Sequence, residues 1–334
     1  MRQSIQWVLA CALLLAHWAC DDAPAPEPPA PTPISWRTTF DATDQGALMS
    51  VWGTSGQDVW AVGGQLDAGV AWHYNAQEWT PVEVPAGPLL NWVHGADGVL
   101  WMVGNEGRIL RREDFEPFEV VESGVTQDLW GVWAASGDRA WAVGGDANAT
   151  MTDPDPVVLE WNGTAWRQIA LPPLDRDIRA LFKVWGTSAD QVFAVGEKGV
   201  IVRYDGAEWK QTIAGTPRDF VSLWGTSPDD IVAVGGRQNG MVARWNGERW
   251  TTEVLEGEPG LNGCFVDQEG VAHLVGQRGR VLQMAPGGFA VQRDENTDRT
   301  LLHAVWGHRT GLFAVGGTLD RTPPWAGVAL ESVP

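Results

Sequence analysis

The sequence predicts an all-β fold: a seven-bladed β-propeller with four-stranded antiparallel blades, the last of which is closed by the N-terminal strand. Variants of the segment Val184–Trp209 (VWGTSADQVFAVGEKGVIVRYDGAEW) recur about every 40 residues, a period typical of propeller blades. The 40 glycines and 21 tryptophans among 334 residues suit short strands joined by tight turns. Seven repeats are marked by the glycine that ends each AVG-like segment: Gly63, Gly104, Gly144, Gly196, Gly235, Gly276 and Gly316.

Each repeat contains four strand signals, and the fourth repeat shows them most clearly. Short apolar runs bounded by turn residues predict strands at Phe182–Thr187, Val192–Gly196, Val200–Tyr204 and Glu208–Thr212. Asp205-Gly206, between the last two runs, is the signal for a type I′ hairpin. Equivalent dipeptides stand at Asn162-Gly163 and Asn246-Gly247, so we expect each repeat to fold as one antiparallel blade.

The two ends of the folded chain supply complementary parts of one blade. The seventh repeat begins at Val305 and ends with Ala326–Val333, without an outer strand that starts with tryptophan. Ser35–Phe40 resembles the outer strand Glu78–Glu83 of the first repeat but has no blade of its own. Pairing the two ends in one sheet removes open edges from the ring. We therefore expect residues 34–334 to form a single propeller domain.

The first 33 residues predict export and anchoring. Trp7–Ala16 is an uncharged apolar run that is too short to span a bilayer but fits a signal peptide, here residues 1–19. Ala19-Cys20 resembles the end of a bacterial lipoprotein signal, which predicts lipidation of Cys20; secretion after cleavage at Ala19 is the alternative. Residues 20–33 are rich in proline and predict a stiff tether. We expect a location in the bacterial cell envelope, lipid-anchored to the inner or outer membrane, or outside the cell.

Motifs for catalysis and metal binding are absent from the sequence. The six histidines form no HxH or HExxH pattern, and neither a GxSxG elbow nor a GxxxxGK[ST] loop is present. Tyr74 and Tyr204 stand where other repeats have Trp161 and Trp245, which indicates packing. Cys264 stands where other repeats have valine or leucine, so we expect a buried thiol. We predict no catalytic residue, no metal ligand and no cofactor; a carboxylate pair from loops of different blades is the catalytic arrangement left open.

Function is expected where the repeats differ from one another. In a propeller, the turns between the second and third strands lie on the same face as the crossings between blades, and the longest of these turns are Gly144–Pro156 and Gly316–Trp325. The candidate binding residues on that face are Trp325, Asp153, Asp155, Asp175, Asp177, Asp320, Arg176 and Arg321. The carboxylates suit either Ca²⁺ or ordinary turn structure, and the arginines suit pairing with them. The tryptophan suits either stacking on a ligand or covering its own loop.

The formal net charge of −19 narrows the range of partners. A strongly acidic surface repels the phosphates of nucleic acids and of anionic lipids. We therefore expect no nucleic-acid ligand, and contact with a membrane only through the lipid anchor. We expect a monomer that binds a protein or a glycan.

The repeats resemble those of secreted bacterial propellers rich in VWGTS…VWAVG units. At lower similarity Val192–Trp209 resembles photosystem II assembly factors and Asp-box (BNR) propellers, although the Asp-box order SxDxGxxW is not met, and the Gly-Gly doublets resemble Kelch propellers. The resemblance implies the fold, and this scaffold hosts binders and enzymes alike. The leading hypothesis is non-catalytic binding or scaffolding of a protein or glycan. A hydrolase or lyase acting on envelope or extracellular polysaccharide is the alternative, and a purely structural envelope protein is a third hypothesis.

Overall fold

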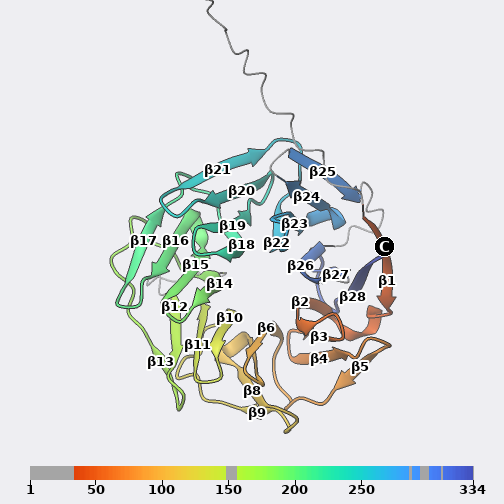
Figure 1. Ribbon diagram of the computed structural model, residues 1–334. Helices are drawn as coiled ribbons and strands as arrows, with labels where there is room; N and C mark the ends of the chain where they lie inside the picture. Colours follow the sequence, from red (N-terminus) through yellow and green to blue (C-terminus); the bar gives the residue numbers. More distant parts are fainter. Residues whose placement is uncertain (1–33, 148–155, 286–287, 294–300, 310, 334) are drawn as a thin grey trace, which may run out of the picture.

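Seven four-stranded sheets surround a central axis in the computed structural model, which describes residues 34–147, 156–285, 288–293, 301–309 and 311–333 (Figure 1). Every sheet is antiparallel, and the chain passes from the inner to the outer strand of one blade before it enters the next. The prediction of a seven-bladed propeller with four-stranded blades is therefore confirmed. The described residues between 34 and 333 form this ring, whereas residues 1–33, with Cys20, lie outside the described residues.

The first three blades run in sequence order from the inner to the outer strand. Blade 1 consists of β2 (Ala47–Ser55), β3 (Asp58–Gln65), β4 (Ala68–Tyr74) and β5 (Trp79–Val82). Blade 2 consists of β6 (Leu90–Ala96), β7 (Val99–Gly104), β8 (Ile109–Glu113) and β9 (Glu119–Val120). Blade 3 consists of β10 (Leu129–Ser136), β11 (Arg139–Gly144), β12 (Val157–Trp161) and β13 (Trp166–Gln168).

Blades 4 to 6 repeat this order. Blade 4 consists of β14 (Leu181–Ser188), β15 (Gln191–Gly196), β16 (Val200–Tyr204) and β17 (Trp209–Ile213), within one or two residues of the strands predicted for this repeat. Blade 5 consists of β18 (Phe220–Ser227), β19 (Asp230–Gly235), β20 (Gly240–Trp245) and β21 (Trp250–Leu255). Blade 6 consists of β22 (Leu261–Val266), β23 (Ala272–Gly276), β24 (Val281–Ala285) and β25 (Gly288–Arg293).

Blade 7 joins the two ends of the chain, as predicted. Its strands are β26 (Leu301–His308), β27 (Gly311–Gly317), β28 (Gly327–Val333) and, on the outside, β1 (Ser35–Phe40). The register places Trp36 opposite Ser332 and Arg37 opposite Glu331, and the last two form an ion pair at 2.9 Å. The two ends therefore lie side by side at the right of Figure 1.

The repeated Trp-Gly dipeptide at the inner strands locks each blade to the next. A Cβ atom built on Gly186 would lie 2.9 Å from the Trp133 ring of the preceding blade, and one on Gly53 would lie 2.9 Å from the Trp306 ring. Only glycine leaves room for these contacts, because real Cβ atoms do not approach that closely. Trp52, Trp133, Trp185 and Trp306 each pack in this way on the glycine of the following blade.

A second aromatic layer lies farther from the axis. In blades 2, 4 and 7 the second strand contributes one ring, which packs against a pair of rings on the outer strands of the next blade. Phe193 of blade 4 lies 6.0 Å from Trp245 and 6.3 Å from Trp250, measured between ring centroids. Tyr74 and Tyr204 occupy the equivalent pair positions, opposite Trp79 and Trp209 respectively, so both tyrosines belong to this packing layer.

Candidate functional site: the loop face

The turns between the second and third strands share one face with the blade crossings, as expected. In the even blades these turns are short 3₁₀ helices: η2 (Asn105–Gly107), η3 (Glu197–Gly199) and η4 (Gln277–Gly279). The Glu106 N–H donates to the Asp128 carboxylate at 3.0 Å, and the Lys198 N–H donates to the Asp219 carboxylate at 2.9 Å. Each aspartate begins the next blade, so it ties that crossing to the preceding turn. We call this side of the ring the loop face.

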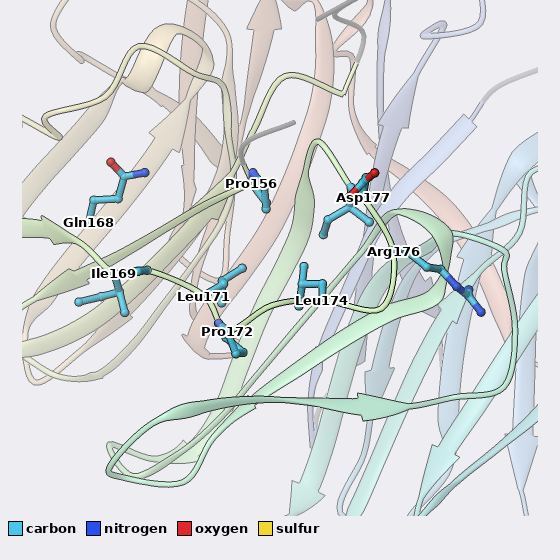
Figure 2. A pocket seen from close by; sticks show the side chains of 10 residues that line it. Pro156, Gln168, Ile169, Leu171, Pro172, Leu174, Arg176 and Asp177 are labelled. Carbon is cyan, nitrogen blue, oxygen red and sulfur yellow. The ribbon is translucent and has the colours of Figure 1, made fainter. Parts of the chain in front are cut away.

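The crossing from blade 3 to blade 4 forms a pocket on the loop face (Figure 2). Its volume is about 540 Å³, and its lining includes the apolar side chains of Ile169, Leu171, Pro172 and Leu174. Pro156, at the start of β12, closes one side, as Figure 2 shows. Polar groups stand at the margin: Gln168, Arg176 and Asp177. The sequence-predicted residues Arg176 and Asp177 thus border a pocket whose apolar side chains the sequence analysis did not single out.

Arg176 is held by backbone carbonyl groups. Its guanidinium donates to the Thr216 carbonyl oxygen at 2.6 Å and to the Lys198 carbonyl oxygen, and it lies 3.8 Å from the Asp175 carboxylate. Figure 2 shows the side chain pointing away from the pocket centre, toward that neighbouring backbone. Arg176 therefore fixes the crossing against blade 4, while its backbone and stem border the pocket.

The two aspartates that flank Arg176 differ in their surroundings. The Asp175 backbone N–H donates to the Gln211 side chain at 2.8 Å, and its carboxylate accepts a hydrogen bond from the same side chain. Asp177 is exposed, and its backbone carbonyl accepts a hydrogen bond from Lys198. Asp175 thus belongs to the scaffold, whereas the Asp177 carboxylate faces solvent at the pocket edge.

Trp325 covers its own loop. Its backbone N–H and carbonyl each form a 2.8 Å hydrogen bond with the Gln65 side chain of blade 1. Its indole N–H donates to the Arg321 carbonyl oxygen at 2.9 Å. The half-buried ring packs on a small cluster that contains Met49 and Leu89. Of the two interpretations of this tryptophan, these contacts match the covering role.

The remaining candidate residues do not form one cluster. Asp320 and Arg321 are exposed in the loop of blade 7, on the far side of the ring from the blade 3 to blade 4 crossing (Figure 1). Asp153 and Asp155 lie outside the described residues. Within the described ranges, no three His, Cys, Asp or Glu side chains are grouped so as to hold a metal ion. Arg176 and Asp177 at the pocket are therefore separate from Asp320 and Arg321 in the loop of blade 7.

The opposite face carries a groove that the sequence analysis missed. Its volume is about 1090 Å³, between blades 6 and 7, and Glu269, His308 and Arg309 stand along it. At its base the buried His273 lies 2.8 Å from the Asp267 carboxylate, from ring Nε2 to oxygen. Burial works against ionisation of Asp267, but the hydrogen bonds from His273 and two backbone N–H groups hold its pKa below the ordinary value.

A break in the repeat signals this groove. The second strands of five other blades place an aromatic ring where blade 6 has His273, as the register shows for Trp101, Phe193 and Phe313, whereas blade 5 has Val232. On the side of blade 7 that faces blade 6, the small Ser332 stands where blade 5 has Trp245. Loss of bulk on both sides of the seam leaves the space open. Comparing the repeats column by column finds this site from sequence.

Comparisons with known proteins show the fold. No protein-family model matches the chain, and no curated protein matches it either. Among solved structures, YCF48 bound to D1 peptide is 14% identical with a TM-score of 0.65, covering 92% of this chain and 99% of that one. The streptogramin B lyase is 9% identical with a TM-score of 0.70, covering 90% and 98%. The WD40 propeller domain of Doa1 is 11% identical with a TM-score of 0.65, covering 89% and 97%.

These neighbours are β-propellers that include a peptide-bound protein and a lyase, so the fold accommodates both binding and catalysis. In the described part of the chain, no helix has the length and apolar character needed to cross a membrane.

Proposed function

We propose that the protein is a non-catalytic binding propeller that recognises a protein segment through the loop face, at the pocket of the blade 3 to blade 4 crossing. The observation that carries the proposal is the group of half-buried apolar side chains in the pocket lining: Ile169, Leu171, Pro172 and Leu174. Pockets of this kind receive the apolar anchor side chain of a partner. YCF48, which shares the fold, is bound to a peptide, and this supports a protein partner over a glycan.

The charge of the molecule defines the partner further. The net charge of −19 favours a segment with basic residues, because opposite potentials steer association. Asp177 supplies an exposed carboxylate at the pocket edge. The segment we expect therefore carries one apolar anchor for the pocket and at least one basic residue beside it.

A charge placed in the pocket tests the proposal. Peptides selected on the wild-type protein from a random library should bind the variant Leu171→Glu at least tenfold more weakly, because the carboxylate puts a charge where the anchor side chain is buried. The matched control is Phe115→Glu, which places the same charge at an exposed position between β8 and β9 of blade 2, outside the residues that line the pocket. Equal loss in both variants, or no loss in Leu171→Glu, would remove the pocket from consideration.

The second candidate function is a hydrolase or lyase acting on envelope or extracellular polysaccharide. The observation that favours it is the groove between blades 6 and 7, where Glu269 and Arg309 lie near two histidines. One carboxylate of the groove, Asp267, is already engaged by His273 and by its own turn, which leaves Glu269 as the acid–base candidate. Release of reducing ends from envelope polysaccharide by the wild type, abolished in Glu269→Gln, would establish this function in place of the first.

We also propose that Cys20 carries a lipid that anchors the propeller in the bacterial envelope through the tether of residues 20–33. Support comes from the apolar run and the Ala19-Cys20 pair in the sequence. Labelled palmitate should be incorporated into the wild type and not into Cys20→Ser. Incorporation that survives the substitution would overturn the assignment.

A further inference from the structure

Lys183 is a buried lysine beside the axis of the ring. It lies on β14 with 4% of its surface exposed, and its Nζ is 2.9 Å from the centre of the Trp92 ring on β6. Blade 3 separates these two blades, so the contact passes over a blade rather than between neighbours. Within the described part of the chain, no carboxylate or hydrogen-bond acceptor contacts this Nζ.

Lys183 and Trp92 are the two large side chains in their layer of the ring. The register places the equivalent residue of every inner strand opposite a valine of the second strand. In the other five blades this residue is small: Ser50, Gly131, Ser222, Gly263 and Ala304. The layer beside the ammonium is therefore lined by glycine, alanine and two buried serine hydroxyls.

The titratable groups nearest to Lys183 are neutral. Cys264 on β22 is buried, which raises the pKa of its thiol to about 12. His303 on β26 is buried too; burial, aided by the charge of Lys183, lowers the pKa of its imidazole to about 4. The lysine thus has no counter-charge, and burial lowers the pKa of its amine well below the ordinary value.

We propose that this layer binds a small monovalent anion between the Lys183 ammonium and the hydroxyl groups of Ser50 and Ser222. A buried ammonium needs an anion or hydrogen-bond acceptors to offset its desolvation, and the described protein groups supply neither. The chemical class is one compact negative charge, such as a small carboxylate or a halide. The site is separate from the pocket at the blade 3 to blade 4 crossing.

Titration calorimetry with sodium formate and with sodium bromide tests the proposal on the full propeller at constant ionic strength. We expect saturable binding near pH 7. Lys183→Met should weaken binding at least tenfold, whereas Lys210→Met should leave it unchanged, since Lys210 is an exposed lysine paired with Asp205 and Glu208. Equal affinity in Lys183→Met, or no saturable binding to the wild type, would overturn the proposal. Formate bound without bromide would assign the site to carboxylates.

A second measurement covers the case in which Lys183→Met fails to fold. Crystals of the wild type soaked in bromide should give an anomalous peak in contact with Nζ of Lys183, and Ser222→Ala should lower its occupancy. Peaks found elsewhere, with none at Lys183, would mean an adventitious ion only and would refute the site. Because neither experiment involves the crossing pocket, their failure leaves the proposed peptide recognition intact.

Discussion

His94 shows how one residue adapts to a change in its neighbour. It stands at the inner-strand position where blades 1, 3, 4, 5 and 7 have tryptophan. The next blade has Ala134 where most blades have glycine, and the Ala134 N–H donates to His94 Nδ1 at 3.1 Å. The imidazole is smaller than an indole and lies beside the alanine, and its ring nitrogen adds a hydrogen bond to the packing against Trp52. Burial lowers the pKa of His94 to about 3.

This burial predicts a loss of stability in mild acid. His94 stays neutral in the folded state down to about pH 3, while the unfolded chain takes up a proton below about pH 6.5. The free energy of unfolding should therefore fall as the pH drops from 6.5 toward 4, by at most about 1.4 kcal/mol per pH unit for each such histidine. His303, with a pKa of about 4, adds to the same slope.

Urea titrations between pH 4 and pH 7 measure this slope. The variant His94→Asn keeps a side-chain acceptor for Ala134 and does not titrate, so its stability should depend less on pH than that of the wild type. An unchanged slope in the variant would show that His94 is not neutral and buried as described.

Replacing the buried Lys183 should stabilise the protein, because its burial lowers the free energy of unfolding. Because its pKa is lowered in the folded state, its burial costs stability at every pH below about 10.5, where the unfolded lysine is charged. Lys183→Met should therefore raise the free energy of unfolding at pH 7 by about 1 kcal/mol or more, since it fills similar space without a charge. The gain should shrink as the pH approaches 10, and a variant less stable than the wild type at pH 7 would contradict this.

At the scale of elements, the Trp-Gly pairing fixes the angle between neighbouring blades. Gly186→Ala should destabilise the protein by about 1–3 kcal/mol, because the new methyl group overlaps the Trp133 ring and the Gln191 carbonyl oxygen. Gly137→Ala, in the turn between β10 and β11, is the matched control, since its nearest neighbour is the end of the Val99 side chain at 3.2 Å. Chemical denaturation measures the free energy of unfolding of both variants. Equal values would show that the contact between Gly186 and Trp133 does not stabilise the protein.

The strands were predictable because the repeat aligns seven versions of the same blade. The contacts of the loop face were not, because they join segments far apart in sequence that occur once. Gln65 holds Trp325 across 260 positions, and nothing near either residue signals the pairing. Arg176 was expected to pair with aspartates, and besides lying 3.8 Å from Asp175 it donates to the backbone carbonyl groups of Lys198 and Thr216. Repetition thus predicts packing, whereas single contacts need the coordinates.

At the scale of the whole molecule, the ring is closed by one short strand. β1 pairs with β28 alone at the outside of blade 7, and the Arg37–Glu331 ion pair lies on this seam. A chain that starts at Asp41 should lose the strand and leave β28 as an open edge. We expect its melting temperature to fall by at least about 5 °C, given about 2–4 °C per kcal/mol for a large domain.

The control for this truncation is a chain that starts at Pro33, which keeps β1 and removes only what precedes it. It should melt like the full-length protein. If the two truncated chains have the same melting temperature, pairing of β1 with β28 contributes nothing to stability. Packing between neighbouring blades would then hold the propeller closed.

The central claim is that a protein segment binds the loop face at the blade 3 to blade 4 crossing, and a hydrogen-exchange footprint tests it most directly. A peptide selected on the wild type is added at saturation, and amide exchange is compared with and without it. The account predicts slower exchange in residues 168–178, with Val266–His273 of the opposite groove unchanged. Slower exchange confined to Val266–His273 would contradict it and assign binding to the other face.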